Sequence, residues 1–159
     1  MKYLSFMRLV VCIAVLMASA AMVEAAKAPD TPDSVKIKPD IKISDLKINR
    51  ISVEPAGHNV QVEVTVVNSV RDTATGPFKA KVEWTEDPTR GFNLLASGGV
   101  ASLDYNSASV AVNNRKTLIF NHQVPTGRSY KYRVTADYLN QVDEADETNN
   151  LASAGYTAL

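Results

Sequence analysis

The chain has 159 residues and no net formal charge at pH 7, with equal numbers of acidic and basic residues. The lysines and arginines alternate with carboxylates along the sequence and form no block, so nucleic acid is not an expected partner. The length is sufficient for a single domain with its own hydrophobic core.

The N-terminus has the layout of a secretory signal peptide. Lys2 and Arg8 precede an apolar run from Leu9 to Met17, and Val23-Glu24-Ala25 fits a cleavage site. No later segment approaches the roughly 20 apolar residues that a membrane-spanning helix needs. We predict a cleaved signal peptide over residues 1–25, export to the periplasm or the extracellular space, and no stable membrane insertion after cleavage.

The segment that follows is expected to be an extended leader over residues 26–39, because prolines punctuate it and apolar residues are sparse. The only cysteine, Cys12, lies within the predicted signal peptide. The mature chain would therefore have neither a disulfide nor a thiol nucleophile, and its fold would depend on burial alone. A folded domain is expected over residues 40–159.

The domain has the period of two that is typical of half-buried β-strands and shows no helical period. Alternating segments are found at residues 41–53, with a kink or bulge expected at Ser44-Asp45, and at 60–66, 78–84, 118–124, 130–138 and 152–158. Residues 68–77 are expected to be a loop, Gly98-Gly99 to be the turn of a hairpin, and Val110 and Val112 to be part of another strand. The pattern predicts an all-β antiparallel sandwich of seven or eight strands.

An acidic run from Val142 to Asn150 is expected to connect the last two strands. Its polar side chains are predicted to structure this hairpin by accepting hydrogen bonds from backbone N–H groups. These hairpin-structuring residues are Asp143, Glu144, Asp146, Glu147, Asn149 and Asn150. Carboxylates also suit calcium, but the spacing lacks the alternating ligands and central glycine of an EF-hand loop. No metal or other cofactor is predicted.

The order of these segments resembles the CARDB family, the cell-adhesion-related domain found in bacteria. The resemblance covers roughly Pro39 to Ala158, beginning with the opening strand from Pro39 to Leu46 and including Gly76-Pro77-Phe78 and the Glu147-Thr148-Asn149-Asn150 end of the acidic run. It implies an immunoglobulin-like sandwich that serves as a binding or spacer module.

Catalysis is not expected. The sequence has no nucleophile-elbow, zinc-protease or phosphate-loop motif. Its two histidines, His58 and His122, are expected in a turn and on a core-facing strand position, respectively. A structural role for His122 is more common at such a position than a catalytic one.

Two segments are candidates for contacts with a partner. Arg90, Phe92, Leu94 and Leu95 place bulky apolar residues in an expected loop, although the same residues could form an edge strand that covers the core. The last strand, from Leu151 to Leu159, lacks the charges and prolines that guard sheet edges, so homo-oligomerisation through this strand is a further hypothesis.

We therefore expect an exported, non-catalytic module that makes protein–protein or cell-surface adhesion contacts. A carbohydrate-binding module is one alternative, and it would require Trp84, Phe92 and Tyr105 to face solvent together, whereas Trp84 is expected to anchor the core. A calcium-stabilised structural subunit of the cell envelope is another alternative.

Overall fold

The computed structural model describes residues 36–105 and 113–159. The predicted signal peptide, most of the predicted leader and the strand expected at Val110 and Val112 lie outside these residues. In the part of the chain that is described, no helix is long and apolar enough to cross a membrane.

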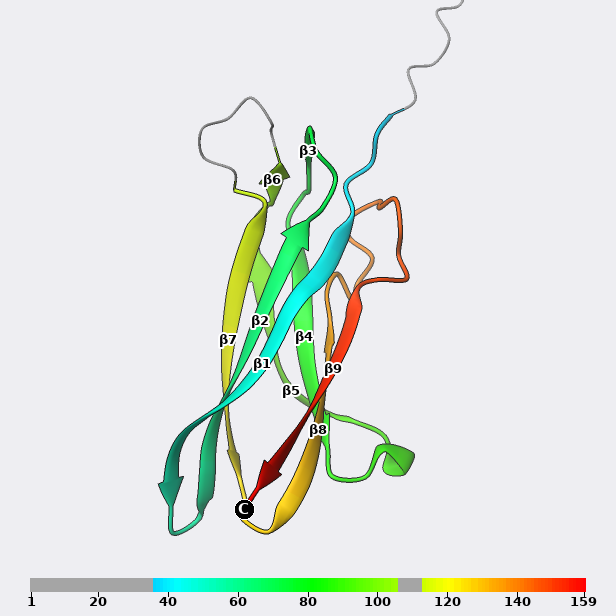
Figure 1. Ribbon diagram of the computed structural model, residues 1–159. Coiled ribbons are helices and arrows are strands. Elements are labelled where there is room, and N and C mark those ends of the chain that lie inside the picture. The colour runs from blue at the N-terminus through cyan, green and yellow to red at the C-terminus, as the bar shows by residue number, and fades with distance from the viewer. Residues whose placement is uncertain (1–35, 106–112) are drawn as a thin grey trace, which may run out of the picture. The chain divides into compact units, whose positions relative to one another are not determined.

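The described residues form nine β-strands, one 3₁₀ turn and no α-helix (Figure 1). In chain order the elements are β1 (Ile41–Glu54), β2 (Gly57–Asn68), β3 (Thr73–Ala74), β4 (Phe78–Thr85), η1 (Pro88–Arg90), β5 (Asn93–Val100), β6 (Asp104–Tyr105), β7 (Arg115–Val124), β8 (Arg128–Thr135) and β9 (Leu151–Ala158). Two of the strands, β3 and β6, are only two residues long.

The strands are arranged in two main antiparallel sheets that face each other. One has the order β1-β2-β7 and the other β5-β4-β8-β9, while β3 and β6 pair separately. Edge strands β1 and β9, which belong to opposite sheets, lie side by side (Figure 1). This arrangement confirms the predicted all-β, immunoglobulin-like antiparallel sandwich.

The core forms where the period-two alternation turns apolar side chains toward the opposite sheet. On β2, residues 60, 62, 64 and 66 are buried valines, and their polar neighbours alternate outward. The four valines face Tyr132 and Val134 of the other sheet, and both of these side chains are completely buried. Each such side chain contributes about 1.5–3 kcal/mol through removal of apolar surface from water.

A second core cluster lies toward the end of the sandwich where β1 begins. Its members are Ile41, Val66, Phe78, Val100, Leu103, Ala136 and Val142. Because Val142 opens the acidic run, that run is attached to the core by an apolar side chain as well as by polar ones.

Strand β1 contains two irregularities. The predicted bulge at Ser44 is confirmed, since the register with β2 shifts between Ile43 and Asp45. A second shift, between Arg50 and Ser52, was not predicted. The following turn needs glycine at position 57, because its φ is 139° and an added Cβ would clash with the carbonyl oxygen of Val124.

Several local predictions were wrong. Gly98 and Gly99 do not form a hairpin turn but continue β5 as one strand. The packing explains this, since a Cβ at Gly98 would come within 3.3 Å of the Phe120 ring, so a small residue lets β5 and β7 approach. The loop expected at residues 68–77 contains the short strand β3.

Two further positions differ from expectation. His58 is not in a turn but is buried in β2, with Nδ1 2.7 Å from the hydroxyl of Tyr156. The alternating segment 130–138 ends early as a strand, at Thr135, because the chain turns at Asp137, whose φ is 39°.

Candidate functional site

The acidic run lies within the connection between β8 and β9 and contacts the start of β1. The N–H of Ala145 donates to the carbonyl oxygen of Pro39 at 2.8 Å. The carboxylate of Asp143 forms an exposed ion pair with Lys38, with Nζ and Oδ1 2.6 Å apart. The last leader residues and the acidic run are therefore joined by both backbone and side-chain contacts.

Glu144 is the buried acid of the run, with 5% of its surface exposed. Its Oε2 accepts a hydrogen bond from the N–H of Ile41 at 2.6 Å, and its Oε1 accepts one from Nδ2 of Asn150 at 3.1 Å. Burial raises the pKa of Glu144 to about 7, although both hydrogen bonds oppose this shift. The Glu144 side chain therefore connects β1 of the three-stranded sheet to the β8–β9 connection of the four-stranded sheet.

The remaining polar residues of the run bond locally or to neighbouring segments. Oδ1 of Asp146 accepts from the N–H and the hydroxyl of Thr148 at 2.9 and 2.6 Å, and these bonds hold the pKa of Asp146 below its usual value. Nδ2 of Asn149 donates to Oδ1 of Asp40 at 2.8 Å. Glu147 Oε1 accepts weakly from the N–H of Glu144 at 3.4 Å.

Asp137 was not singled out from the sequence, yet it organises the start of the same connection. It is buried, and its two carboxylate oxygens accept from the N–H groups of Gln141 and Val142 at 2.9 and 2.8 Å. Asp tolerates left-handed backbone and bonds to nearby N–H groups, so an Asp at the end of an alternating segment is the signal that could have identified it.

Asn68, at the end of β2, completes this region. It is fully buried, and its Nδ2 donates to the carbonyl and hydroxyl oxygens of Thr73, each at 3.0 Å. Its Oδ1 accepts from the backbone N–H of Asp40 at 3.3 Å. We call Asp40, Asn68, Asp137, Glu144 and Asn150 the polar clasp.

The polar clasp does not have the arrangement of a metal site. Among the residues that the structure describes, no group of three or more His, Cys, Asp or Glu side chains could hold a metal ion. The oxygens of Asp137 and Glu144 already accept hydrogen bonds from N–H groups of the chain. We therefore assign no function of this region to a metal.

The structure places the predicted contact residues in different environments; these residues are Arg90, Phe92, Leu94 and Leu95. Arg90 closes the turn η1, and Leu94 and Leu95 lie on edge strand β5. Leu95 packs against the core, whereas Leu94 is 64% exposed. Phe92 is half-buried, and the guanidinium carbon of Arg133 lies 4.1 Å from its ring centroid. The edge-strand interpretation therefore holds for Leu95, and Leu94 stays a candidate contact.

Beside these residues, the outward side of β4 and β8 carries basic side chains, and we call it the basic face. Its members are Lys79, Lys81, Lys131 and Arg133, together with one acid, Glu83. In sequence these residues alternate with core residues in two separate strands. The sequence did not show that the two strands pair, so it did not show that the charges combine.

The centre of the basic face is a preorganised charge network. Glu83 Oε2 lies 2.9 Å from Nη2 of Arg133, and its Oε1 lies 3.2 Å from Nζ of Lys81. Lys81 Nζ is also 5.5 Å from the ring centroid of Tyr138, so that each cation is placed against an aromatic ring. The network fixes side chains that would otherwise be mobile.

The aromatic platform that a carbohydrate-binding module would need does not form from the three predicted residues. Trp84 packs against the core, with its ring centroid 4.8 Å from that of His122. Tyr105 belongs to β6, whereas Phe92 follows η1. Figure 1 shows that β6 and η1 lie at opposite ends of the sandwich. Nδ1 of His122 lies 3.0 Å from the hydroxyl oxygen of Tyr132, and burial lowers the pKa of the His122 imidazole.

The fold defines an immunoglobulin-like sandwich module, and comparison with known proteins identifies its family. The CARDB family model matches residues 38–154, and the chain belongs to this family. CARDB is a cell-surface-associated, non-catalytic domain family. A search of curated proteins found no match.

Solved structures support the same fold. The CARDB domain of a Pyrococcus furiosus protein, solved in complex with di-metal ions, is 20% identical, with a TM-score of 0.54, and the match covers 83% of this chain and 99% of that one. A domain of a candidate cell surface protein from Methanosarcina acetivorans is 22% identical, with a TM-score of 0.52, and the match covers 77% of this chain and 94% of that one.

Proposed function

We propose that this chain is an exported, non-catalytic module that makes protein–protein or cell-surface contacts through its basic face. The observation that carries the proposal is the ordered network of Lys81, Glu83 and Arg133, with the Phe92 ring under the guanidinium. Arginine and aromatic side chains held in place are characteristic of interface centres, because little side-chain entropy is lost when a partner binds.

The surroundings of this network favour an acidic partner with apolar side chains. The basic face has four cations and one carboxylate, so it attracts negative charge. Leu94 and Leu151, which are 64% and 57% exposed, lie at its margins on the two edge strands of the same sheet. Exposed apolar residues around a charged centre exclude water when a partner binds.

The test is binding of the processed chain to isolated cell envelopes of the organism that produces it, at low and high salt. The variant Leu94→Ser/Lys131→Ala should bind at least about tenfold more weakly, because it removes one apolar and one charged contact. The matched control Ile37→Ser/Lys42→Ala removes one exposed apolar and one exposed basic side chain at and just before the start of β1 and should bind normally. Equal binding by both variants would refute the proposal.

We also propose export by a cleaved signal peptide, supported by the sequence pattern of residues 1–25. Mass spectrometry of the chain recovered outside the cytoplasm should give the mass of residues 26–159. Recovery of the uncleaved chain in the cytoplasm would contradict it.

Self-association through β9 is a second candidate function. This strand is an edge of the four-stranded sheet and has no charged residue to prevent pairing. The variant Ser153→Lys places a charge on its outward side without touching the core. If the wild-type chain forms a dimer in sedimentation experiments, this variant should be a monomer, and a persistent dimer would exclude β9 as the interface.

A further inference from the structure

We propose that the outward face of the three-stranded sheet binds a neutral carbohydrate through a set of carboxamide side chains. We call this surface the carboxamide face and define it as Asn49, Asn59, Gln61, Asn121 and Gln123. The proposal concerns a different sheet from the basic face and does not depend on the function proposed above.

The β-sheet register brings these side chains into two neighbouring rows. In the first row, Asn49 of β1 pairs with Gln61 of β2, which pairs with Asn121 of β7. Paired residues in adjacent strands have their Cβ atoms about 4.5–5.5 Å apart, so a single small ligand can reach all three amides.

The second row lies two residues along the strands on the same face. It consists of Ser52, Asn59 and Gln123. The unpredicted register shift in β1 between Arg50 and Ser52 is what aligns Ser52 with Asn59, whose Nδ2 donates to the Ser52 hydroxyl at 2.9 Å. Irregularities of this kind are often found where a strand presents side chains to a ligand.

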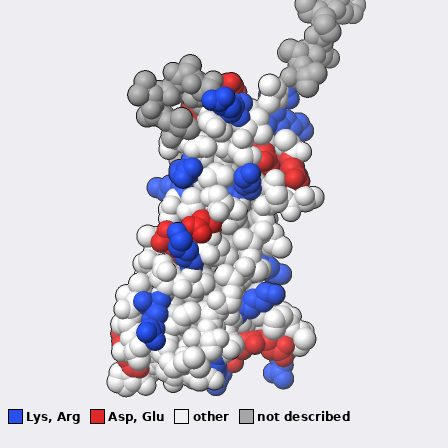
Figure 2. Space-filling model, in the orientation of Figure 1, with Lys and Arg blue, Asp and Glu red and all other residues white. Residues whose placement is uncertain are grey.

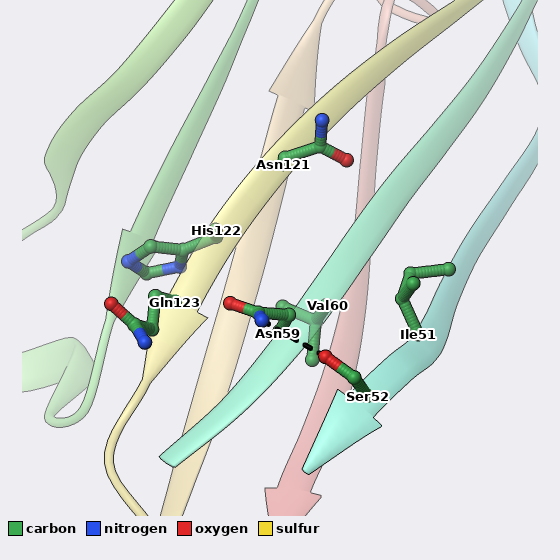
Figure 3. Close-up of a pocket in the computed structure, with 7 residues that line it drawn as sticks. All are labelled: Ile51, Ser52, Asn59, Val60, Asn121, His122 and Gln123. Atoms are coloured by element: carbon green, nitrogen blue, oxygen red, sulfur yellow. Dashed lines mark hydrogen bonds between the residues drawn. The ribbon is translucent and has the colours of Figure 1, made fainter. Parts of the chain in front are cut away.

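A hollow of about 420 Å³ lies over the second row and over Asn121 of the first, and Figure 3 shows the residues that line it. This volume is within the range of small-molecule sites. The residues that line the hollow are Ile51, Ser52, Asn59, Val60, Asn121, His122 and Gln123. They come from three adjacent strands, so their positions are fixed before any ligand arrives.

The hydrogen-bonding groups of this face are available to a ligand. Within the described part of the chain, the side chains of Asn49, Gln61, Asn121 and Gln123 make no hydrogen bond to other protein groups. Asn121 and Gln123 are also exposed. Each carboxamide offers two donors and an acceptor, which is the combination that sugar hydroxyl groups can satisfy.

The charge of the face favours a neutral ligand. The rows contain no ionisable side chain. The charged groups beside them are the Lys47–Asp45 ion pair, Glu63, and Glu54, whose carboxylate accepts from Nδ2 of Asn59. These carboxylates disfavour an anionic ligand. Figure 2 shows an uncharged area in the lower centre of the face toward the viewer, with charged side chains at its left and right margins. Ile51 and Ile119, which are 59% and 57% exposed, flank the amides and provide apolar contacts for the C–H groups of a sugar.

The experiment is an NMR titration of the processed chain with three neutral oligosaccharides: maltotriose, cellotriose and chitotriose. The side-chain NH₂ signals of the carboxamide face should shift with at least one of them, with a Kd on the order of 1 mM, since the site has no stacking aromatic ring. The variant Asn121→Ala/Gln123→Ala should weaken binding at least about tenfold. The control Asn93→Ala/Gln141→Ala removes two exposed carboxamides elsewhere and should bind normally.

Three results would overturn the proposal. The first is the absence of a shift with any of the three sugars, and the second is an unchanged Kd in the Asn121→Ala/Gln123→Ala variant. The third is a shift of the same signals with protein concentration in the absence of sugar, which would assign the face to contact with a second copy of the chain. None of these results bears on the envelope binding expected of the basic face.

Discussion

The polar clasp and the carboxamide face are both rich in polar side chains, yet they use them in opposite ways. Asn68 in the clasp is fully buried and bonds to the backbone and side chain of Thr73, whereas Asn121 on the sheet is exposed and has no protein partner among the described residues. The same carboxamide group therefore holds the fold in one place and remains available for a ligand in the other. Hydrogen-bond partners, more than residue type, distinguish the two roles.

The largest effect is expected from Asp137→Ala. This change leaves the N–H groups of Gln141 and Val142 without their acceptor, and alanine is strained at a φ of 39°. We expect a loss of about 3 kcal/mol in the free energy of unfolding, measured by urea denaturation. The control Asp143→Ala removes only an exposed ion pair and should cost less than about 1 kcal/mol. Similar losses in both variants would show that a residue of the polar clasp contributes no more to stability than an exposed residue.

Asn68→Ala should come next, with a loss of about 2 kcal/mol. It removes the donor to Thr73 and the acceptor for the N–H of Asp40 in a site with no exposed surface. Urea denaturation measures the effect. A loss below about 0.5 kcal/mol is usual for surface substitutions, and it would contradict the stabilising role that distinguishes Asn68 from Asn121.

Glu144 should make the stability of the domain depend on pH. Its pKa is raised from 4.5 to about 7 in the folded chain, so the folded state binds more protons than the unfolded state between these values. For this group the stabilisation should be complete below about pH 4.5 and should fall by about 3 kcal/mol as the pH rises to 8. Glu144→Gln should flatten this dependence, whereas Glu147→Gln, at an exposed position, should retain it. An unchanged slope in Glu144→Gln would contradict the assignment.

The smallest effect is expected from Asn121→Ala/Gln123→Ala. Because neither side chain has a protein hydrogen bond to lose, the free energy of unfolding should change by less than about 0.5 kcal/mol. Urea denaturation of this variant beside Asn68→Ala compares the two kinds of carboxamide directly. A loss as large as that of Asn68→Ala would mean that the carboxamide face stabilises the fold.

The sequence predicted most of the sandwich because alternation of side chains depends only on neighbours along one strand. The valines of β2 and the bulge at Ser44 could be located in this way. The basic face could not, because it depends on the pairing of β4 with β8, whose register places Glu83 opposite Arg133.

Other features were missed for the same reason. Gly98 looked like a turn residue, but its small size serves the approach to Phe120 of another strand. The second register shift in β1, which aligns Ser52 with Asn59, has no proline or glycine to mark it. The acidic run was located correctly from its composition, whereas the contact of Glu144 with Ile41 is a long-range feature that composition does not reveal.

The most direct test of the proposed function is lysine labelling of the processed chain with and without cell envelopes. The expected result is reduced acetylation of Lys79 and Lys131 on the basic face, with unchanged labelling of the exposed Lys42 and Lys116 on the other sheet. Protection of Lys42 and Lys116 alone, or labelling that the envelopes leave unchanged at every lysine, would contradict a contact through the basic face.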